Sequence, residues 1–419
     1  MTATAQGYDT LTRGGMNMNE KKKWDLSALA TIPLIMTLAN SMLIPVLPLI
    51  QKKLHISSLQ SSLIITVYAA ISILCIPFAG YLSDRFGRKR IIVIGLCIAA
   101  VGGLISGIAA WLLHDHVYAF ILAGRLIQGI GAAGAFPIVM PLVGDMYKSE
   151  EEVSNGLGII ETSNTLGKVL SPILGSALAL IIWFLPLAVI PVISTVSILA
   201  VIFLVKTPKQ PNTTKLDFRD FLVSLKSIFA ENGKWLFVIF TLGGSAMFIM
   251  FGFLYYLSSI LEDSYHIDGI WKGTLLAIPL SAICIASFAS GKWIGKNKIK
   301  MKWLTVVGFV FIAAAMLICG LTNTKSLFFL ISLMFISGLG IGLVLPSLDA
   351  LITEGIDKKQ RGTITSFYSS TRFIGVACGP LVASLLLLHI ASLFYIFVAI
   401  ACGCCLIALF FIKPSQINI

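Results

Sequence analysis

The stretch that decides the fold is residues 80–90, GYLSDRFGRKR, which joins two long apolar runs. Gly80 and Gly87 allow the chain to turn tightly, and Arg85, Arg88 and the basic residues after them give the turn a high positive charge. Membrane proteins retain basic turns of this kind on the cytoplasmic side of the bilayer, beside anionic lipid headgroups. The stretch therefore predicts two membrane-spanning helices joined by a short cytoplasmic loop.

The composition extends this prediction to the whole chain. Of the 419 residues, 57% are hydrophobic and 12% are charged, whereas soluble proteins are about half apolar and about a quarter charged. These values exclude a soluble protein. The formal net charge of +12 would suggest a nucleic-acid partner in a soluble chain, but in a membrane protein it reflects basic cytoplasmic loops, so no nucleic-acid partner is expected.

Twelve apolar stretches are long enough to cross a hydrocarbon core of about 30 Å as helices. They lie near residues 27–50, 60–82, 91–113, 117–144, 155–180, 183–205, 235–258, 271–291, 303–321, 326–351, 363–388 and 391–412. With the N-terminus inside, the cytoplasmic segments hold 24 lysine and arginine residues, and the external loops hold four, Lys52, Lys53, Lys272 and Lys325. Because basic residues stay on the cytoplasmic side, both termini are predicted to be cytoplasmic.

The longest polar connection divides the twelve spans into six and six. We expect a cytoplasmic segment at 1–26, a six-helix bundle at 27–205, a cytoplasmic linker at 206–234, a second bundle at 235–412 and a cytoplasmic tail at 413–419. Apolar residues of the linker recur at helical spacing beside lysine and arginine. This pattern predicts an amphipathic helix, which either lies on the membrane surface or packs under the bundle.

The two halves share a residue pattern. Gly129, Gly131, Pro137 and Asp145 recur 209 positions later as Gly338, Gly340, Pro346 and Glu354. An internal repeat of six helices is typical of transporters in which two halves rock about a substrate site near the middle of the membrane.

Three motifs resemble those of the major facilitator superfamily. The stretch at 80–90 is similar to its signature G-x-L-x-D-R-x-G-R-K/R-x between spans 2 and 3. RLIQGIG at 125–131 resembles the R-x-x-Q-G-x-G motif of proton-coupled drug exporters, and GKVLSPILGS at 167–176 resembles the antiporter motif G-x-x-x-G-P-x-x-G-G with serine at two glycine positions. The resemblance implies an all-α membrane protein with the fold of that superfamily: twelve helices in two pseudo-symmetric bundles, acting as a drug:proton antiporter.

The resemblance also implies roles for individual residues. In the superfamily the first motif is a conformational clasp between the halves, here Gly80, Asp84, Arg85, Gly87 and Arg88. A carboxylate such as Asp84 can accept hydrogen bonds from helix N-termini or pair with a cation of the other half. The antiporter motif, here Gly167, Pro172 and Gly175, seals the outer side of the cavity in the family, and its small residues allow close helix approach.

Ionisable side chains inside predicted spans are candidates for function, because each costs roughly 2.5 to 3.5 kcal/mol to insert into the bilayer. They are Arg125, Glu161, Lys168, Asp349 and Arg372. Glu161, Asn164 and Lys168 follow one another at helical spacing and so share one face. That face must point into the bundle.

Glu161 is the predicted proton carrier. Burial and nearby cations change how tightly a carboxyl group holds its proton, which is what proton coupling requires. We expect Glu161 to exchange partners among a proton, Arg125 or Lys168, and the substrate, with Arg372 facing the same cavity. The alternative is a permanent buried ion pair that only holds the helices together.

The remaining candidates are polar or aromatic residues near the expected cavity and acids near the cytoplasmic ends of spans 4 and 10. The cavity candidates are Gln128, Asn164, Asn40, Tyr368 and Phe251, and the gate candidates are Asp145, Asp349 and Glu354. Three cations against two acids within the spans leave the cavity neutral to positive. This balance predicts a neutral, zwitterionic or anionic amphiphile as substrate.

The sequence therefore predicts a monomeric, proton-driven exporter of small amphipathic compounds in the bacterial cell membrane. The alternatives are a dedicated exporter or flippase for an anionic or zwitterionic metabolite, siderophore or lipid and, from another class, a membrane receptor or lipid-modifying enzyme. No Walker A motif, nucleophile elbow or metal-ligand spacing occurs. We expect no enzymatic activity, no metal and no cofactor, with the proton gradient as the energy source.

Overall fold

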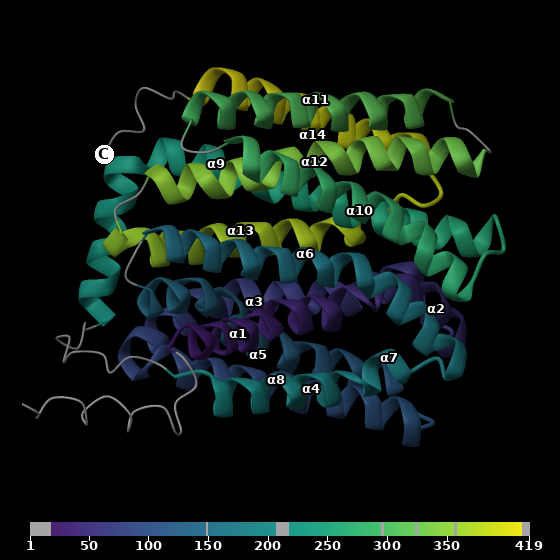
Figure 1. Cartoon of the computed structure of the whole chain (residues 1–419). Coiled ribbons are helices and arrows are strands. Elements are labelled where there is room, and N and C mark those ends of the chain that lie inside the picture. The colour runs from purple at the N-terminus through teal and green to yellow at the C-terminus, as the bar shows by residue number, and fades with distance from the viewer. Residues whose placement is uncertain are drawn as a thin grey trace, which may run out of the picture.

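The computed structural model describes residues 18–147, 150–206, 218–294, 297–322, 326–355 and 358–412. In this part of the chain all regular secondary structure is helical, and Figure 1 shows the long helices running side by side. A helix satisfies its own backbone hydrogen bonds, so it can cross a membrane where water supplies no partners. The prediction of an all-α membrane protein is confirmed.

The first half of the chain forms the lower part of the bundle in Figure 1. Its elements are α1 (Met18–Ser41), the 3-10 turn η1 (Ile44–Val46), α2 (Leu47–Leu54), α3 (Ser58–Phe86), α4 (Arg88–Leu112), α5 (Val117–Met146), α6 (Glu150–Ile181), α7 (Leu185–Ala188) and α8 (Ile190–Leu204).

The second half forms the upper part of the bundle. Its elements are α9 (Phe218–Asp263), α10 (Gly269–Ile294), α11 (Lys298–Thr322), α12 (Leu327–Gly355), α13 (Lys358–Leu385) and α14 (Ile390–Phe411). The halves meet mainly where α3 packs against α13 and α6 packs against α10. Of the predicted linker, residues 207–217 lie outside the described residues, and the rest from Phe218 onward begins α9, whose first turns cross the end of the bundle (Figure 1).

Eleven of the described helical segments are long and apolar enough to cross a membrane. The one predicted span left over, 363–388, overlaps α13, which is a long helix but is not among the eleven. Its first half is rich in serine and threonine and also carries Arg372. Because α13 packs against α3 and α9 inside the bundle, these polar residues meet protein rather than lipid.

Two predicted spans are interrupted helices. The span at 27–50 is a helix that stops at Ser41 and resumes as η1 and α2, and the span at 183–205 is divided into α7 and α8. Proline lies in the first turn of each resumed segment, where its missing backbone N–H leaves no helical hydrogen bond unmade.

The half repeat has a packing reason. A methyl group on Gly129 of α5 would collide with the backbone of Tyr68 in α3, and one on Gly338 of α12 would collide with the backbone of Pro279 in α10. The repeated glycines thus let the fourth long helix of each half approach the second helix of that half at backbone distance. Gly87 has φ +98° at the single-residue turn between α3 and α4, a conformation that favours glycine.

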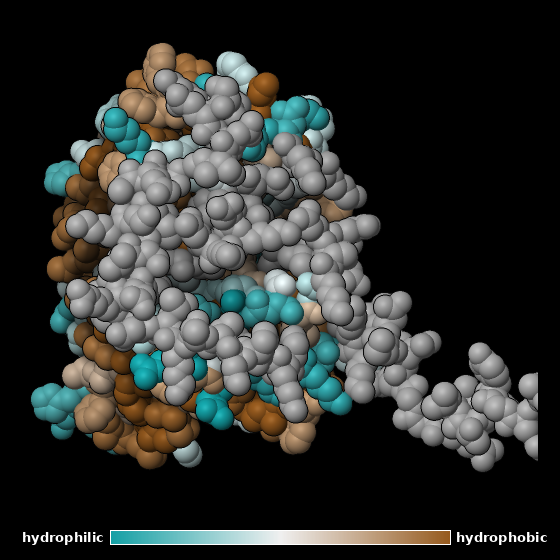
Figure 2. Space-filling view, turned by 90° about the vertical axis from the view of Figure 1, so that its left-hand side faces the viewer, coloured by the Kyte–Doolittle hydropathy of each residue, from teal (hydrophilic) through white to brown (hydrophobic). Residues whose placement is uncertain are grey.

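The two ends of the bundle differ. We call the end with the α3–α4 turn the Arg88 end, and the end with α2 and the last turn of α9 the Lys52 end. Figure 2 looks onto the Arg88 end and shows a hollow in the middle of this face with hydrophilic side chains visible inside it. Hydrophobic residues cover the flanks in this view. Large apolar side chains of the protein, such as Phe203, Phe237 and Phe328, are exposed, as contact with lipid requires.

Candidate functional site

Four charged side chains from three helices lie around one region in the middle of the bundle. Glu161 and Lys168 come from α6, Asp349 from α12 and Arg372 from α13. Arg372 Nη1 lies 3.4 Å from Asp349 Oδ1, and the charges of Glu161, Asp349 and Arg372 act on the Lys168 ammonium group. We call these four residues the central charge cluster. It joins the α6 face to the helices of the second half.

The Glu161 carboxylate has only weak local partners. Asn164 Nδ2 donates to it at 3.2 and 3.4 Å, while Asn164 Oδ1 accepts a hydrogen bond of 2.6 Å from Thr37 on α1. Among the described residues, Glu161 forms no ion pair within 4.0 Å. In this conformation its oxygens remain open to a proton or to a donor group of a ligand.

Lys168 is the most unusual cation of the cluster. It is 7% exposed, and within the described part of the chain its ammonium group has neither a hydrogen bond nor an ion pair. It lines a pocket together with Ser41, Pro172 and Phe251, at the level where α1 breaks. A buried ammonium group without a partner is costly, so it favours an incoming anionic or strongly accepting group.

Arg125 is fully buried and held by uncharged groups. Its guanidinium donates to the Ile64 carbonyl at 2.9 Å, to Gln128 Oε1 at 2.5 Å and to Asn40 Oδ1 at 2.5 Å, and it lies 4.3 Å from the centre of the Tyr68 ring. The two cavity candidates Gln128 and Asn40 are therefore partners of Arg125 in this conformation. The described contacts place Arg125 in a packed polar core, whereas Lys168 is the cation among the residues that line the pocket.

The aromatic candidates come from helices of the second half of the chain, Tyr368 from α13 and Phe251 from α9. Tyr368 is 2% exposed, its ring lies 5.6 Å below the Arg372 guanidinium, and it packs against Phe240. Phe251 of α9 lines the pocket that contains Lys168. Both rings thus lie within the protein rather than against lipid.

The antiporter-motif residues pack α6 tightly against its neighbours. A side chain on Gly167 would meet the backbone of Leu34 in α1, and one on Gly175 would meet the backbone of Met42, directly after α1. The Pro172 backbone lies against Gly273 of α10. These residues bring α6 close both to α1 and, across the two halves, to α10.

At the Arg88 end, the clasp residues are joined to one another within the first half. Arg88 Nε lies 2.8 Å from Asp145 Oδ2, and Arg88 Nη2 lies 3.6 Å from Asp84 Oδ1. Among the described residues no ion pair joins the two halves at this end. Gly80 approaches Ser366 of α13, and the side chain of Glu354 lies outside the described part of the chain.

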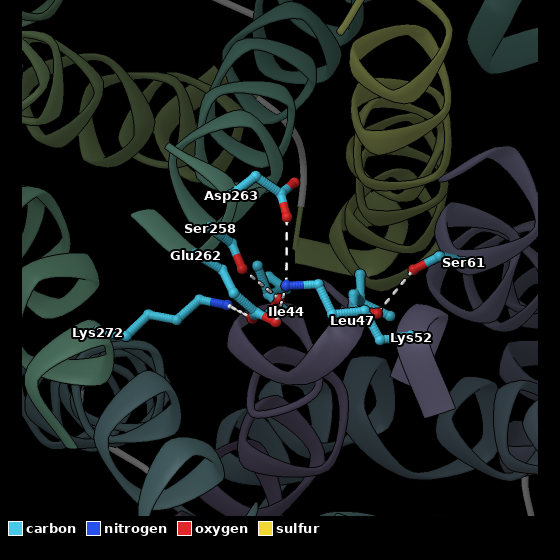
Figure 3. Close-up of polar contacts among 8 residues, drawn as sticks. All are labelled: Ile44, Leu47, Lys52, Ser61, Ser258, Glu262, Asp263 and Lys272. Atoms are coloured by element: carbon cyan, nitrogen blue, oxygen red, sulfur yellow. Dashed lines mark hydrogen bonds and ion pairs between the residues drawn. The ribbon is translucent and has the colours of Figure 1, made fainter. Parts of the chain in front are cut away.

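Sequence reasoning missed a charge cluster at the Lys52 end, which Figure 3 shows in detail. Lys272 Nζ lies 2.8 Å from Glu262 Oε2, and Lys52 Nζ lies 2.9 Å from Glu262 Oε1. The assignment of Lys272 to an external loop is wrong, because it lies in the first turn of α10 with its side chain 2% exposed. The sequence holds one signal for this cluster: Glu262 follows one apolar span and Lys272 lies at the start of the next.

Comparison with known proteins agrees with this architecture. The model of the Major Facilitator Superfamily matches residues 29–377 and 302–418. A bacillibactin exporter of Bacillus subtilis (strain 168) is 49% identical over 389 residues, which cover 93% of this chain and 95% of that protein. The multidrug efflux protein YfmO of the same organism is 27% identical over 365 residues, covering 83% of this chain and 82% of that protein.

A solved structure has the same fold. The crystal structure of a bacterial homologue of the human lysosomal transporter Spinster, in an inward-facing and unoccupied conformation, superimposes with a TM-score of 0.74 at 17% identity, covering 96% of this chain and 98% of that one. The fold, the family model and the relatives that align over most of their length all indicate the same family. The chain belongs to the major facilitator superfamily and is a multi-pass membrane transporter rather than an enzyme.

Proposed function

We propose that the protein exports a small amphipathic molecule in exchange for protons, with Glu161 as the proton carrier and Lys168 as the group that receives an anionic or strongly accepting part of the substrate. The observation that carries this proposal is the burial of Lys168, a residue of the pocket lining whose ammonium group has no hydrogen bond or ion pair among the described residues. A positive group of this kind favours an anionic or zwitterionic substrate over a simple lipophilic cation.

The direction of coupling decides which groups the substrate needs. In exchange, a proton and the substrate must compete, so the substrate has to bind more tightly when Glu161 is ionised. An anionic group alone would not meet this condition, because protonation of Glu161 leaves Lys168 freer to bind it. The substrate therefore also needs hydroxyl or ammonium donors that bind the Glu161 carboxylate and are displaced when the proton arrives.

The spacing of the two groups sets a minimum size for the substrate. Glu161 and Lys168 are seven residues apart on α6, or about 10 Å of helix rise. A molecule that contacts both side chains must cover a comparable distance. A siderophore, with many hydroxyl donors and acidic groups, meets both conditions, and the similarity to a bacillibactin exporter supports this substrate class.

Export of unrelated drugs is the second candidate. The RLIQGIG motif around Arg125 and the similarity to a multidrug efflux protein support it. The two candidates differ in substrate range, since a dedicated exporter transports one family of compounds.

The test is transport by the full chain in proteoliposomes with an imposed pH gradient. Bacillibactin and a panel of cationic, neutral and anionic drugs are each added, and proton movement is followed with a pH-sensitive dye. We expect bacillibactin to move protons in the wild type and not in Glu161→Gln, which lacks the carboxylate and should bind bacillibactin more weakly. Proton movement with many unrelated drugs would favour the second candidate. If no compound moves protons, or if Glu161→Gln keeps full coupling, the proposal fails.

A further inference from the structure

Glu262 is shared by two lysines that belong to different halves of the protein. Lys272 lies on α10, in the same half as Glu262, and Lys52 lies on α2, in the other half. The two ammonium groups lie 2.8 and 2.9 Å from different oxygens of the carboxylate, and Lys52 also lies 3.4 Å from Asp263 (Figure 3). We call Lys52, Glu262 and Lys272 the Lys52 lock.

The two partners of Glu262 differ sharply in burial. The Lys272 side chain is 2% exposed and that of Glu262 is 12% exposed, whereas Lys52 is 56% exposed. Separating a buried pair leaves two charges without solvation, so Lys272 and Glu262 stay together. An exposed lysine regains water when its pair breaks, so Lys52 can leave at little cost.

Neither charge of the buried pair stabilises its own helix. Glu262 lies in the last turn of α9, which ends at Asp263, and Lys272 lies in the first turn of α10, which begins at Gly269. Both charges therefore have the sign that a helix dipole disfavours at that end. Their placement is explained by the pairing between them and with Lys52, and not by capping of the helices.

The residues before Glu262 on the same helix also bind the first half. Ser258 Oγ donates to the Ile44 carbonyl at 2.9 Å, and the Tyr255 hydroxyl donates to the Ser58 carbonyl at 2.9 Å. Residues 255, 258 and 262 recur at helical spacing and so form one face of α9. This face meets η1, α2 and the first residue of α3, so it is a contact between the two halves.

From this geometry we propose that the Lys52 lock holds the Lys52 end closed, that Lys52 is its movable part, and that Lys272 is a positioning residue that keeps the Glu262 carboxylate aimed at Lys52. When the halves separate at this end, Lys52 leaves while the Glu262–Lys272 pair remains intact. When this end closes again, Lys52 therefore returns to a Glu262 carboxylate that Lys272 already holds in position. This role is independent of the transported compound and of proton coupling.

The experiment measures opening directly. Hydrogen–deuterium exchange of the full chain in lipid nanodiscs reports on η1 and on the end of α9. We expect Lys52→Met to increase exchange in these segments by about 1.4-fold to fivefold, the range for loss of one exposed ion pair, and Lys52→Arg to show the exchange of the wild type. Lys53→Met, which removes an exposed neighbouring lysine outside the lock, is the matched control. Equal effects of Lys52→Met and Lys53→Met would overturn the proposal.

A double-mutant cycle separates positioning by Lys272 from simple packing. If Lys272 aims Glu262, removing Lys52 has a smaller effect on exchange in a Lys272→Met background than in the wild type. If Lys272 only fills space, the two effects add, and the positioning role is wrong. Lys272→Arg, which keeps the charge, provides a variant that folds if Lys272→Met does not, and it is expected to retain the full effect of Lys52→Met.

Discussion

Arg88 Nε lies 2.8 Å from the Asp145 carboxylate, so the turn between α3 and α4 is tied to the end of α5, and among the described residues no ion pair ties it to the second half of the transporter. Asp84 is more weakly engaged, at 3.6 Å from Arg88 with half of its side chain exposed. In this conformation the Asp84 carboxylate is accessible at the end of the bundle that is hollowed (Figure 2).

The first prediction concerns Asp84. Asp84→Asn should abolish turnover but leave substrate binding intact, because the carboxylate is needed only when the halves meet at the Arg88 end. Asp145→Asn should instead lower the free energy of unfolding by about 0.2 to 1 kcal/mol, the range for a partly exposed ion pair. Transport in proteoliposomes and thermal unfolding in detergent measure the two effects. Normal turnover of Asp84→Asn would exclude a clasp.

A second prediction concerns Lys168. Lys168→Met should weaken binding of an anionic substrate roughly 10- to 100-fold, the loss of one hydrogen bond to a charged group of about 1.5 to 3 kcal/mol, and should leave a neutral analogue unaffected. Lys168→Arg should retain most of the affinity, since the charge is kept. Isothermal titration calorimetry of the purified protein provides the measurement. An equal loss for the charged and the neutral compound would indicate a structural role instead.

Arg125 should prove to be a structural residue. Arg125→Met leaves Asn40 and Gln128 buried without their partner, at a cost of about 1 to 3 kcal/mol each. The double variant Arg125→Met with Asn40→Leu should recover part of the lost stability, because one orphaned amide is then removed. Thermal unfolding midpoints compare the variants. A double variant no more stable than Arg125→Met would argue against this account.

Gly273 tests the contact between α6 and α10. A methyl group there would collide with the Pro172 backbone across the two halves, and overpacking of this kind costs about 1 to 3 kcal/mol. Gly273→Ala should therefore push the halves apart and reduce transport. Gly158→Ala, on a part of α6 where a methyl group has nothing within 4 Å, is the matched control and should transport normally. Similar transport by both variants would show that the close approach is dispensable.

The membrane architecture could be predicted because it depends on local properties of the chain. All twelve spans are predicted from length and apolar character, and eleven of the described helices meet that criterion, whereas α13 is more polar than the prediction assumed. The buried position of Arg125 follows from its place inside a span, but its amide partners do not, because Asn40 lies 85 residues away and only packing joins them. The Lys52 lock has the same origin: Lys52 and Glu262 are brought together by closure of the halves, which no local pattern encodes.

The polarity of α13 has a consequence for biosynthesis. A segment that begins with several hydroxyl side chains and carries a central arginine partitions poorly into a bilayer as a single helix. Its neighbours in the chain, α12 and α14, are among the apolar spans and can enter the membrane independently. We therefore expect stable insertion of α13 to depend on its packing against α3 and α9, which would couple its entry into the membrane to the union of the two halves.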